Sequence, residues 1–302
     1  MKQLRIAALG ALLSLGLFAL LRFPAESAAA ARTGLSLALE TVLPSLFPFF
    51  VLSALCVSCG AADALARVLA GIMAPFFALS GAGSAALVLG LLGGYPVGAR
   101  TAAQLCEQGS LSRAEAEQLL AFCNNAGPGF VLGICGGAVF HSVRAGVYLY
   151  LIHAASALLT GLLLRRGSAP SRRGGYRAPR APLSLLRAFP DAVRDSFAAV
   201  WNVCGFVILF AVLLRLLTLL LPASDVPLLL GAVELTNGVL ALPDTRVGFV
   251  QCAALLAWGG LSVHAQTLSV LGELSARRYF LGKLIQTALS VPLALLASLR
   301  LF

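Results

Sequence analysis

Two neighbouring amide side chains are the most concentrated polar chemistry in the apolar parts of this sequence. Asn124 and Asn125 lie in the segment Phe122–Phe130, together with glycines and a proline, which interrupt helices. An amide both donates and accepts hydrogen bonds, so it serves partners of either sign. We therefore predict that Asn124, Asn125 and Gly127 form the unwound centre of a broken or re-entrant helix, with free backbone dipoles beside a ligand. The alternative is helix packing, in which Asn bridges helices for about 1 kcal/mol.

Ionisable side chains also occur inside apolar segments, where their burial costs free energy and therefore points to a function. Glu234 lies just before the interruption Thr236–Gly238, and His264 follows a Gly-Gly pair; for both, a structural role is an equal alternative. With the matching residues of the first half, the candidate substrate-binding residues are Tyr95, Arg100, Asn124, Asn125, Glu234, Asn237 and His264. The residues expected to break or hinge the backbone are Pro48, Gly94, Pro96, Gly127, Pro128, Gly238 and Gly260.

Three further ionisable residues have simpler structural explanations. Arg215 and Lys283 can extend along their helices and place their charges at the membrane surface, which we favour over contact with a ligand. We expect His153 to form a hydrogen bond between helices rather than to carry a proton.

Signatures of catalysis and of nucleotide or metal binding are absent from the sequence. Lys283 is followed by leucine, so no phosphate-binding loop is formed there, and neither H-E-x-x-H nor G-x-S-x-G occurs. Ser262 and His264 are two residues apart and would point in different directions on a helix. The seven cysteines are scattered through apolar segments, and the C-x-x-C pair at Cys56 has no second pair. We therefore expect no enzyme, no catalytic residue, no metal site and no cofactor.

The elements that hold these residues must be membrane helices. Of the 302 residues, 59% are hydrophobic and 11% charged, and the mean hydropathy is +0.92; a soluble protein carries about twice that charged fraction. Apolar runs of ~20 residues are long enough to span a bilayer, and several of them predict an all-α, polytopic helical protein of the cell membrane. The runs are Ile6–Leu21, Leu35–Cys59, Ala126–Phe140, Gly146–Leu164, Cys204–Leu221, Phe249–Leu271 and Leu281–Leu299.

The net charge of +10 is concentrated in one connector. Arginines recur from Arg165 to Arg180 before the next acidic residue, Asp191. A short basic loop between spans lies in the cytoplasm by the positive-inside rule, so we do not expect nucleic-acid binding. The chain then divides into an N-terminal membrane helix with its connector, which we take as uncleaved, a first membrane half, a basic cytoplasmic linker and a second membrane half. Their bounds are 1–34, 35–164, 165–195 and 196–302.

The two membrane halves are weakly similar, which predicts an internal repeat. Leu119–Asn125 is similar to Leu255–Leu261, and Leu89–Gly94 to Leu230–Leu235, in the same order. Many secondary transporters are built from repeats of this kind around broken helices. An unpaired backbone group facing lipid costs several kcal/mol, so such breaks must be buried in protein or line a wet cavity.

The topology of the halves depends on their short segments. Counting spans from a cytoplasmic N-terminus gives parallel repeats, but re-entrant hairpins at Leu87–Ala99 or Leu228–Leu242, which are short enough to re-enter, would change that parity. The sequence therefore leaves both parallel and inverted repeats open. The polar stretch Arg100–Gln118 contains a capping-box sequence, Ser112–Glu115, and indicates an amphipathic helical hairpin at the cytoplasmic surface.

Three motifs of the first half together resemble a known family. Leu43–Leu52, Gly94–Arg100 and Phe122–Pro128 are similar to the signature of the sporulation integral membrane protein YlbJ family of endospore-forming Firmicutes. That family carries the nucleoside-recognition, or Gate, domain shared with concentrative nucleoside transporters. The resemblance, which runs from about Leu35 to the C-terminus, implies a membrane protein of spore formation with a Gate-like core, but not nucleoside transport. Matched residue by residue, it implies candidate pocket positions at Tyr95, Pro96, Arg100, Asn124, Asn125, Gly127 and Pro128.

From these observations we expect a gradient-driven or partner-coupled transporter of a small polar solute. The alternative, from another class, is a non-transporting membrane scaffold that recruits partners for assembly of the spore cortex. The expected partners are the lipid bilayer, an unidentified small solute and sporulation membrane proteins, with no nucleic acid. Assembly into a homo-oligomer is left open by the sequence, as are the substrate, the coupling ion and the direction.

Overall fold

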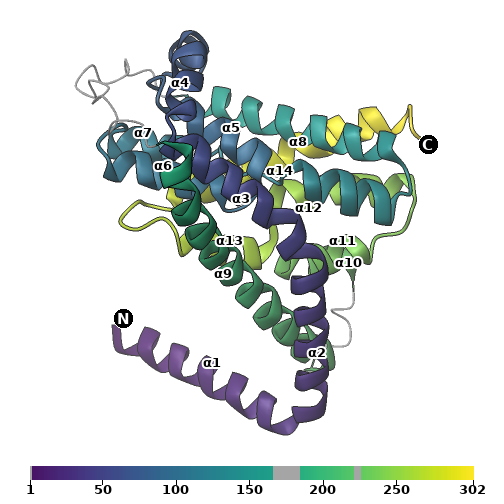
Figure 1. Ribbon diagram of the computed structural model, residues 1–302. Helices are drawn as coiled ribbons and strands as arrows, with labels where there is room; N and C mark the ends of the chain where they lie inside the picture. The colour runs from purple at the N-terminus through teal and green to yellow at the C-terminus, as the bar shows by residue number, and fades with distance from the viewer. Residues whose placement is uncertain (1, 166–183, 221–225) are drawn as a thin grey trace.

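The described residues form helices and connecting turns, without strands (Figure 1). The computed structural model describes residues 2–165, 184–220 and 226–302. The linker arginines between residues 166 and 183 therefore lie outside the described residues. With η for a π-helical segment, the first half contains α1 (Lys2–Arg22), α2 (Pro24–Leu37), η1 (Ala38–Val42), α3 (Leu43–Ser58), α4 (Ala61–Ile72), η2 (Met73–Phe77), α5 (Gly83–Gly93), α6 (Val97–Glu107), α7 (Arg113–Leu119), η3 (Gly129–Val139) and α8 (Val143–Leu163). The second half contains α9 (Leu185–Leu220), α10 (Pro227–Val233), α11 (Leu235–Leu240), α12 (Arg246–Trp258), α13 (Gly260–Leu268) and α14 (Arg277–Ser298).

The long apolar helices confirm a polytopic membrane protein. Among the described residues four helices are long and apolar enough to cross a membrane, namely α8, α9, α14 and the broken helix Arg246–Leu268. A fifth crossing is formed if the pair Leu13–Arg22 and Pro24–Val42, bent by 100°, is one span. Proline begins the second member of this pair, because it fits the first turn of a helix but cannot continue one.

Apart from α1, α4 and η2, which occur only in the first half, the described elements of both halves follow the same order. Each begins with a long helix (α2–η1–α3 or α9), continues with a short helical hairpin (α5/α6 or α10/α11) and a broken helix (α7–η3 or α12–α13), and ends with a full span (α8 or α14). Side-chain caps at several helix starts come from the sequence itself: Ser142 Oγ accepts from Ala145 N, and Thr245 Oγ1 accepts from Gly248 N.

The two halves are inverted with respect to each other, which decides between the parallel and inverted repeats that the sequence left open. At one end of the molecule, which we call the linker end, α7 begins beside the α13–α14 connection, where Arg113 and Glu117 bond to residues 273 and 275. At the opposite end, Phe140 after η3, Phe249 early in α12 and Phe302 after α14 pack ring against ring. The broken helices therefore run in opposite directions, as do α8 and α14, which lie side by side (Figure 1).

The parity follows from three elements in each half that run from one end of the molecule to the other: α2–η1–α3, α7–η3 and α8 in the first half, and α9, α12–α13 and α14 in the second. The hairpins do not cross, because both arms of α5/α6 reach the linker end, and both arms of α10/α11 reach the opposite end. Glycines make these tight hairpins possible. A Cβ on Gly98 would lie 1.9 Å from the carbonyl oxygen of Cys123, and one on Gly238 would lie 2.0 Å from Cα of Gly231. An odd number of crossings per half inverts the second half.

The two long helices pack antiparallel and form an outer pair, α2–η1–α3 against α9, beside the remaining core. Gly34 lies against the backbone of Ile208, and Cys204 Sγ lies 3.8 Å from the carbonyl oxygen of Ala38. Pro48 does not interrupt this pair. It lies inside the continuous α3, one turn after the π-helical segment η1.

The Arg100–Gln118 stretch is only partly the surface hairpin that we expected. The predicted capping box is present, since Ser112 Oγ accepts from Glu115 N while Glu115 bonds back to Ser112 N. However, the stretch begins within α6, whose Thr101, Ala102 and Ala103 are buried.

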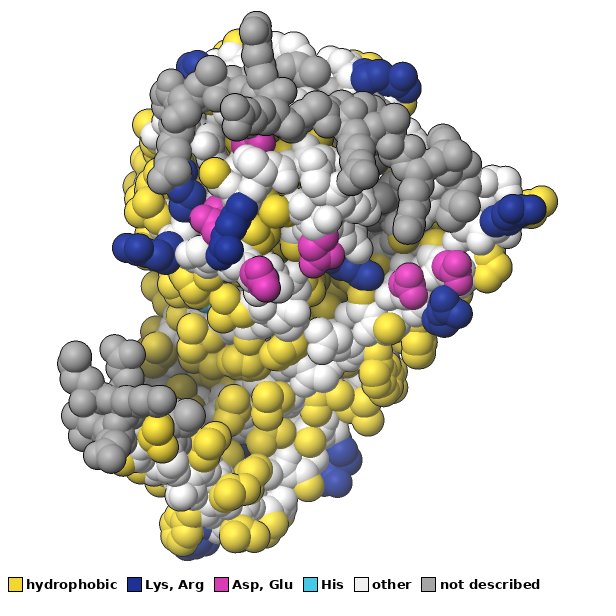
Figure 2. Space-filling model, turned by 90° about the vertical axis from the view of Figure 1, so that its left-hand side faces the viewer, with side chains coloured by type: hydrophobic (Ala, Val, Ile, Leu, Met, Phe, Trp, Pro, Cys, Tyr) yellow, Lys and Arg dark blue, Asp and Glu magenta, His cyan; other side chains and the backbone are white. Residues whose placement is uncertain are grey.

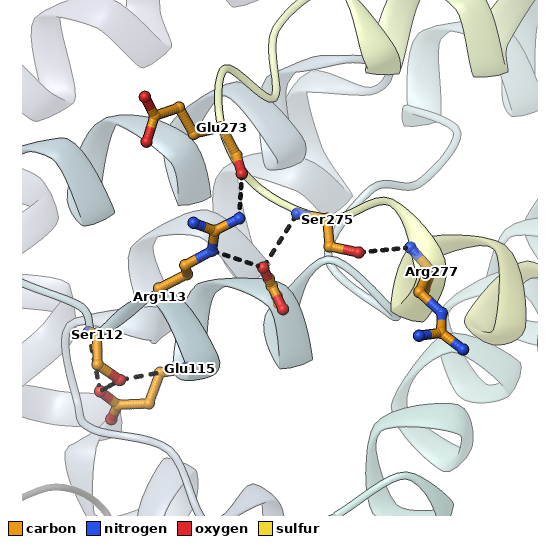
Figure 3. A network of polar contacts seen from close by, with 7 residues as sticks. Ser112, Arg113, Glu115, Glu273, Ser275 and Arg277 are labelled. Carbon is orange, nitrogen blue, oxygen red and sulfur yellow. Dashed lines mark hydrogen bonds and ion pairs between the residues drawn. The ribbon is translucent and has the colours of Figure 1, made fainter. Parts of the chain in front are cut away.

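Charged side chains tie the linker end together. Arg113 Nε and Ser275 N both donate to Glu117 Oε1, each at 3.0 Å (Figure 3). Burial opposes the negative charge of Glu117, but these hydrogen bonds outweigh it and hold the pKa of this carboxyl below its usual value. Figure 2, which looks onto this side of the molecule, shows charged side chains gathered in its upper part and hydrophobic side chains below.

Candidate functional site

The chain breaks of both halves converge on one central cavity between the core and the outer helix pair. From the first half it is lined by Gly94 and Tyr95 in the hairpin turn and by Ala126 and Gly127 in the break after α7. From the second half come the hairpin turn at Glu234 and the start of α13. The volume open to water is about 70 Å³, room for a few water molecules. Its polar lining residues are Thr41, Tyr95, Glu234, Thr236, Ser262 and Gln266.

Glu234 brings a carboxylate to this cavity. It ends α10 in extended conformation and caps α11, because its Oε2 accepts from the backbone N and the side-chain Nδ2 of Asn237, both at 2.8 Å. Only 2% of the residue is exposed. One carboxylate oxygen is thus committed to holding the turn. The carboxylate is placed where a hydrogen-bond donor or cation in the cavity can reach it.

Behind the cavity lies a second feature, a buried polar cluster around Lys283. Its Nζ donates to the backbone oxygen of Asn124 at 2.6 Å and to Gln286 Oε1 at 3.1 Å. Gln286 Nε2 donates to Asn125 Oδ1 at 3.2 Å and to the backbone oxygen of His153 at 3.3 Å. These bonds join α14 of the second half to the break of the first half.

A second branch of the cluster reaches α13. Asn124 Nδ2 donates to Thr267 Oγ1 at 2.8 Å, and the hydroxyl of Tyr279 lies 3.3 Å from that oxygen and 2.7 Å from His264 Nδ1. His153 Nε2, on α8, accepts a hydrogen bond from the backbone N of Ala126, in the break after α7, at 3.0 Å. His153 therefore links two segments by a hydrogen bond, which is the role that we expected for it. Every side chain of the cluster is buried.

The predicted residues do not all meet in one place. Tyr95 and Glu234 line the central cavity, while Asn124 and Asn125 are fully buried behind it, with their neighbours Ala126 and Gly127 on its wall. His264 is buried beside Tyr279, Trp258 and Phe280. Of the hinge residues, Gly94 and Gly127 lie so close together that a Cβ on Gly94 would be 3.0 Å from the backbone N of Gly127.

The remaining two candidates, Arg100 and Asn237, line separate hollows on either side of the cavity. Arg100 lies in a hollow between α6, α3 and the start of α9, with Asp195 and Asn202 across from it. Asn237 lies in another between α11, α2 and the end of α9, with Glu26 and Arg215. Arg215 is exposed, as expected for an extended side chain, and it borders this second hollow.

Sequence reasoning missed the centre of the cluster. Lys283 was expected to reach the membrane surface, but it is 1% exposed and points into the protein. Gln286 and Tyr279 carried no signal of their own, because a single polar residue in an apolar helix does not tell which neighbour it faces. Their spacing held a hint: Tyr279, Lys283 and Gln286 recur at intervals of four and three and so share one helix face.

The three hollows lie in a row along the outer helix pair. Along α2–η1–α3 their linings use residues 25–33, then 41–46, then 50–58, and along α9 they use 211–218, then 203–207, then 195–202. The volume open to water is about 600 Å³ and 470 Å³ in the outer hollows but only about 70 Å³ in the central one. The structure is therefore hollowed from both ends and narrow at the centre.

The fold and site define the class: a polytopic α-helical membrane protein of two inverted halves, whose re-entrant hairpins and broken helices meet at a central cavity. Residues 39–139 match the Gate family, described as nucleoside recognition, and so include the first-half wall of the cavity. The sporulation integral membrane protein YlbJ of Bacillus subtilis (strain 168) is 31% identical over 307 residues, covering 87% of this chain and 75% of that protein. No solved structure matches the chain.

The chain belongs to the family of this sporulation integral membrane protein, as its motifs predicted. It is a multi-pass membrane protein whose first half carries a Gate region. Among the described residues no three His, Cys, Asp or Glu side chains are grouped as metal ligands.

Proposed function

We propose that this protein is a carrier that moves a small polar solute across a membrane of a sporulating cell. The observation that carries the proposal is the row of three hollows, whose narrow central member lies where the breaks of two inverted halves meet. Inverted repeats with discontinuous helices at a central site are the architecture in which one half rocks against the other to open each side in turn. The name of the relative in Bacillus subtilis supplies the setting of sporulation.

The solute would bind between the two hairpin turns. Glu234, Ser262 and Gln266 offer a carboxylate, a hydroxyl and an amide from the second half, and Tyr95 offers an aromatic face from the first. Ser262 Oγ is buried without a hydrogen-bond partner in the described residues, which is costly unless something in the cavity bonds to it. The outer helix pair forms the opposite wall through apolar residues such as Val203 and Val207, over which the core can slide.

The proposal is tested by complementation in a spore-former that lacks its own relative of this chain. Glu234→Gln keeps the size of the side chain and one acceptor for the cap of α11 but removes the charge in the cavity. The matched control is Glu273→Gln, the same change on an exposed loop at the linker end. We expect Glu234→Gln to lower the yield of heat-resistant spores at least tenfold at equal membrane abundance, and Glu273→Gln to restore spores fully.

A third variant separates the carrier from a scaffold. Neutralising the arginines between residues 165 and 180 would remove a docking surface for partners without touching the cavity. If that variant inserts correctly and fails while Glu234→Gln restores spores, the carrier is contradicted and the scaffold takes its place.

A further inference from the structure

The ammonium of Lys283 occupies a site with the chemistry of a cation-binding site. Its contacts are a backbone carbonyl oxygen, that of Asn124, and an amide oxygen, that of Gln286. The ring of Tyr95 completes the surroundings, with Nζ 5.1 Å from its centre. Carbonyl oxygens and aromatic faces are the groups that bind monovalent cations and ammonium ions.

The carbonyl oxygen of Asn124 is available because the helix is broken there. Residues 124–127 have no helical conformation, and Pro128, where helix resumes, lacks the amide hydrogen that a helix would offer to this oxygen from four residues on. Broken-helix carriers use oxygens released in this way to coordinate Na⁺. Here the released oxygen faces a lysine from the other half, so the chain supplies the cation itself.

The charge has no acidic counterpart nearby. Within the described residues Lys283 forms no ion pair: its Nζ bonds to the backbone oxygen of Asn124 and to the amide of Gln286. The imidazoles of His153 and His264 and the thiol of Cys123 also lie near enough to interact with its charge. A buried charge without an ion-pair partner must be stabilised by oriented dipoles. Oriented dipoles would hold a bound metal ion in the same way. Unlike a salt bridge, this kind of stabilisation does not depend on one particular charged partner.

We propose that Lys283 is a built-in cation, whose ammonium fills a monovalent-cation site between the first-half break and α14 and docks the two halves without a bound metal ion. The site would accept Na⁺, K⁺ or a small alkylammonium ion once the lysine side chain is removed. The inference concerns the docking of the halves and holds whether or not the protein transports a solute.

The test compares Lys283→Ala, which leaves space for an added cation, with Lys283→Met, which fills the same space without charge. Thermal unfolding of the full chain in detergent is followed in choline chloride, whose head group is too large for the site, and then with NaCl, KCl or ethylammonium chloride added. We expect both variants to unfold about 5 °C or more below the wild type in choline chloride. Ethylammonium or one of the metal ions should raise the unfolding temperature of Lys283→Ala with increasing concentration, as binding to the folded state requires.

Lys283→Met and the wild type should not respond to these cations, and neither should Thr287→Ala, a control one turn further along α14 that leaves the ammonium in place. If Lys283→Met is as stable as the wild type, or if no cation stabilises Lys283→Ala, the proposal is wrong. If Lys283→Ala cannot be extracted as a single species, its yield is compared between extractions in ethylammonium and in choline chloride. A recovered yield supports the site, and equal yields contradict it.

Discussion

At the scale of single residues, the buried cluster behind the cavity carries an unusual share of the polar contacts between the halves. Asn124, His264 and Tyr279 come from three different elements, and each bonds to a side chain or backbone group of another. Three side-chain atoms of this cluster have no hydrogen-bond partner in the described residues, namely Asn124 Oδ1, His153 Nδ1 and His264 Nε2. Such a network holds its residues rigidly where the polar atoms are hydrogen-bonded, and removing one of its hydrogen bonds lowers the stability of the folded protein.

Removing one hydroxyl tests this statement. Tyr279→Phe deletes the group that lies 2.7 Å from His264 Nδ1 and 3.3 Å from Thr267 Oγ1, and it leaves the imidazole buried without that bond. We expect the folded protein to lose about 1–3 kcal/mol of stability, because an unsatisfied buried group loses its full desolvation free energy. Unfolding in detergent, followed by heating or by a denaturing detergent, measures the change.

The same deletion on the neighbouring span is the control. Tyr148 lies half-buried on α8 beneath Arg144, and its hydroxyl has no hydrogen-bond partner within the described part of the chain. Tyr148→Phe should change stability by less than about 0.5 kcal/mol. Equal effects of the two variants would show that the cluster contributes nothing specific.

At the scale of elements, the hairpins and breaks depend on close backbone contact. The α5/α6 hairpin crosses the end of the α7 segment at Gly90 and Gly98, both directly against the carbonyl of Cys123. The α10/α11 hairpin crosses itself at Gly231 and Gly238. Close contacts between glycines and backbone therefore occur in the hairpins of both halves. These small residues fix how deeply each hairpin enters the protein and so determine the position of the cavity.

A single methyl group should displace the first hairpin. In Gly98→Ala the new Cβ would lie 1.9 Å from the oxygen and 2.7 Å from the carbon of the Cys123 carbonyl, which is backbone and cannot move aside cheaply. We expect a loss of about 3 kcal/mol or of folded protein altogether, measured as the yield of monodisperse protein and its unfolding temperature. Gly133→Ala is the matched change on η3, where a Cβ meets nothing within 4 Å, and it should be neutral. Normal folding of Gly98→Ala would mean that the hairpin and the break are not in contact.

At the scale of the whole molecule, the inversion places equivalent loops of the two halves on opposite sides of the membrane. The connection before α7 lies at the linker end, and the equivalent connection before α12 lies at the end away from the linker. Single cysteines at the exposed positions Gln108 and Asp244 report on the two sides.

Labelling with a membrane-impermeant maleimide distinguishes inverted halves from parallel halves. With the linker in the cytoplasm, Asp244→Cys should be labelled in intact cells and Gln108→Cys only after permeabilisation, whereas parallel halves would place both positions on the same side. The wild-type chain, whose seven cysteines are buried or half-buried, gives the background. Labelling of both positions from the same side would contradict the inverted fold.

The sequence by itself determined the helical membrane class, the positions of the chain breaks and the family. These depend on local composition: apolar runs insert as helices, and clusters of Gly, Pro and Asn interrupt them, whereas single prolines such as Pro48 and Pro292 lie inside continuous helices. Glu234 was identifiable for the same reason, because a carboxylate beside a break is conspicuous in an apolar segment.

Only the tertiary structure decided the inversion of the halves, the direction in which Lys283 points and the separation of the asparagines from the cavity. The relative orientation of the halves depends on whether the short hairpins cross the membrane or turn back, and the composition of the hairpins does not encode this. A lysine near a helix end has the same apolar neighbours in sequence whether it reaches for the surface or turns inward. What settles it is the carbonyl of Asn124, 159 residues away in the chain and 2.6 Å away in space.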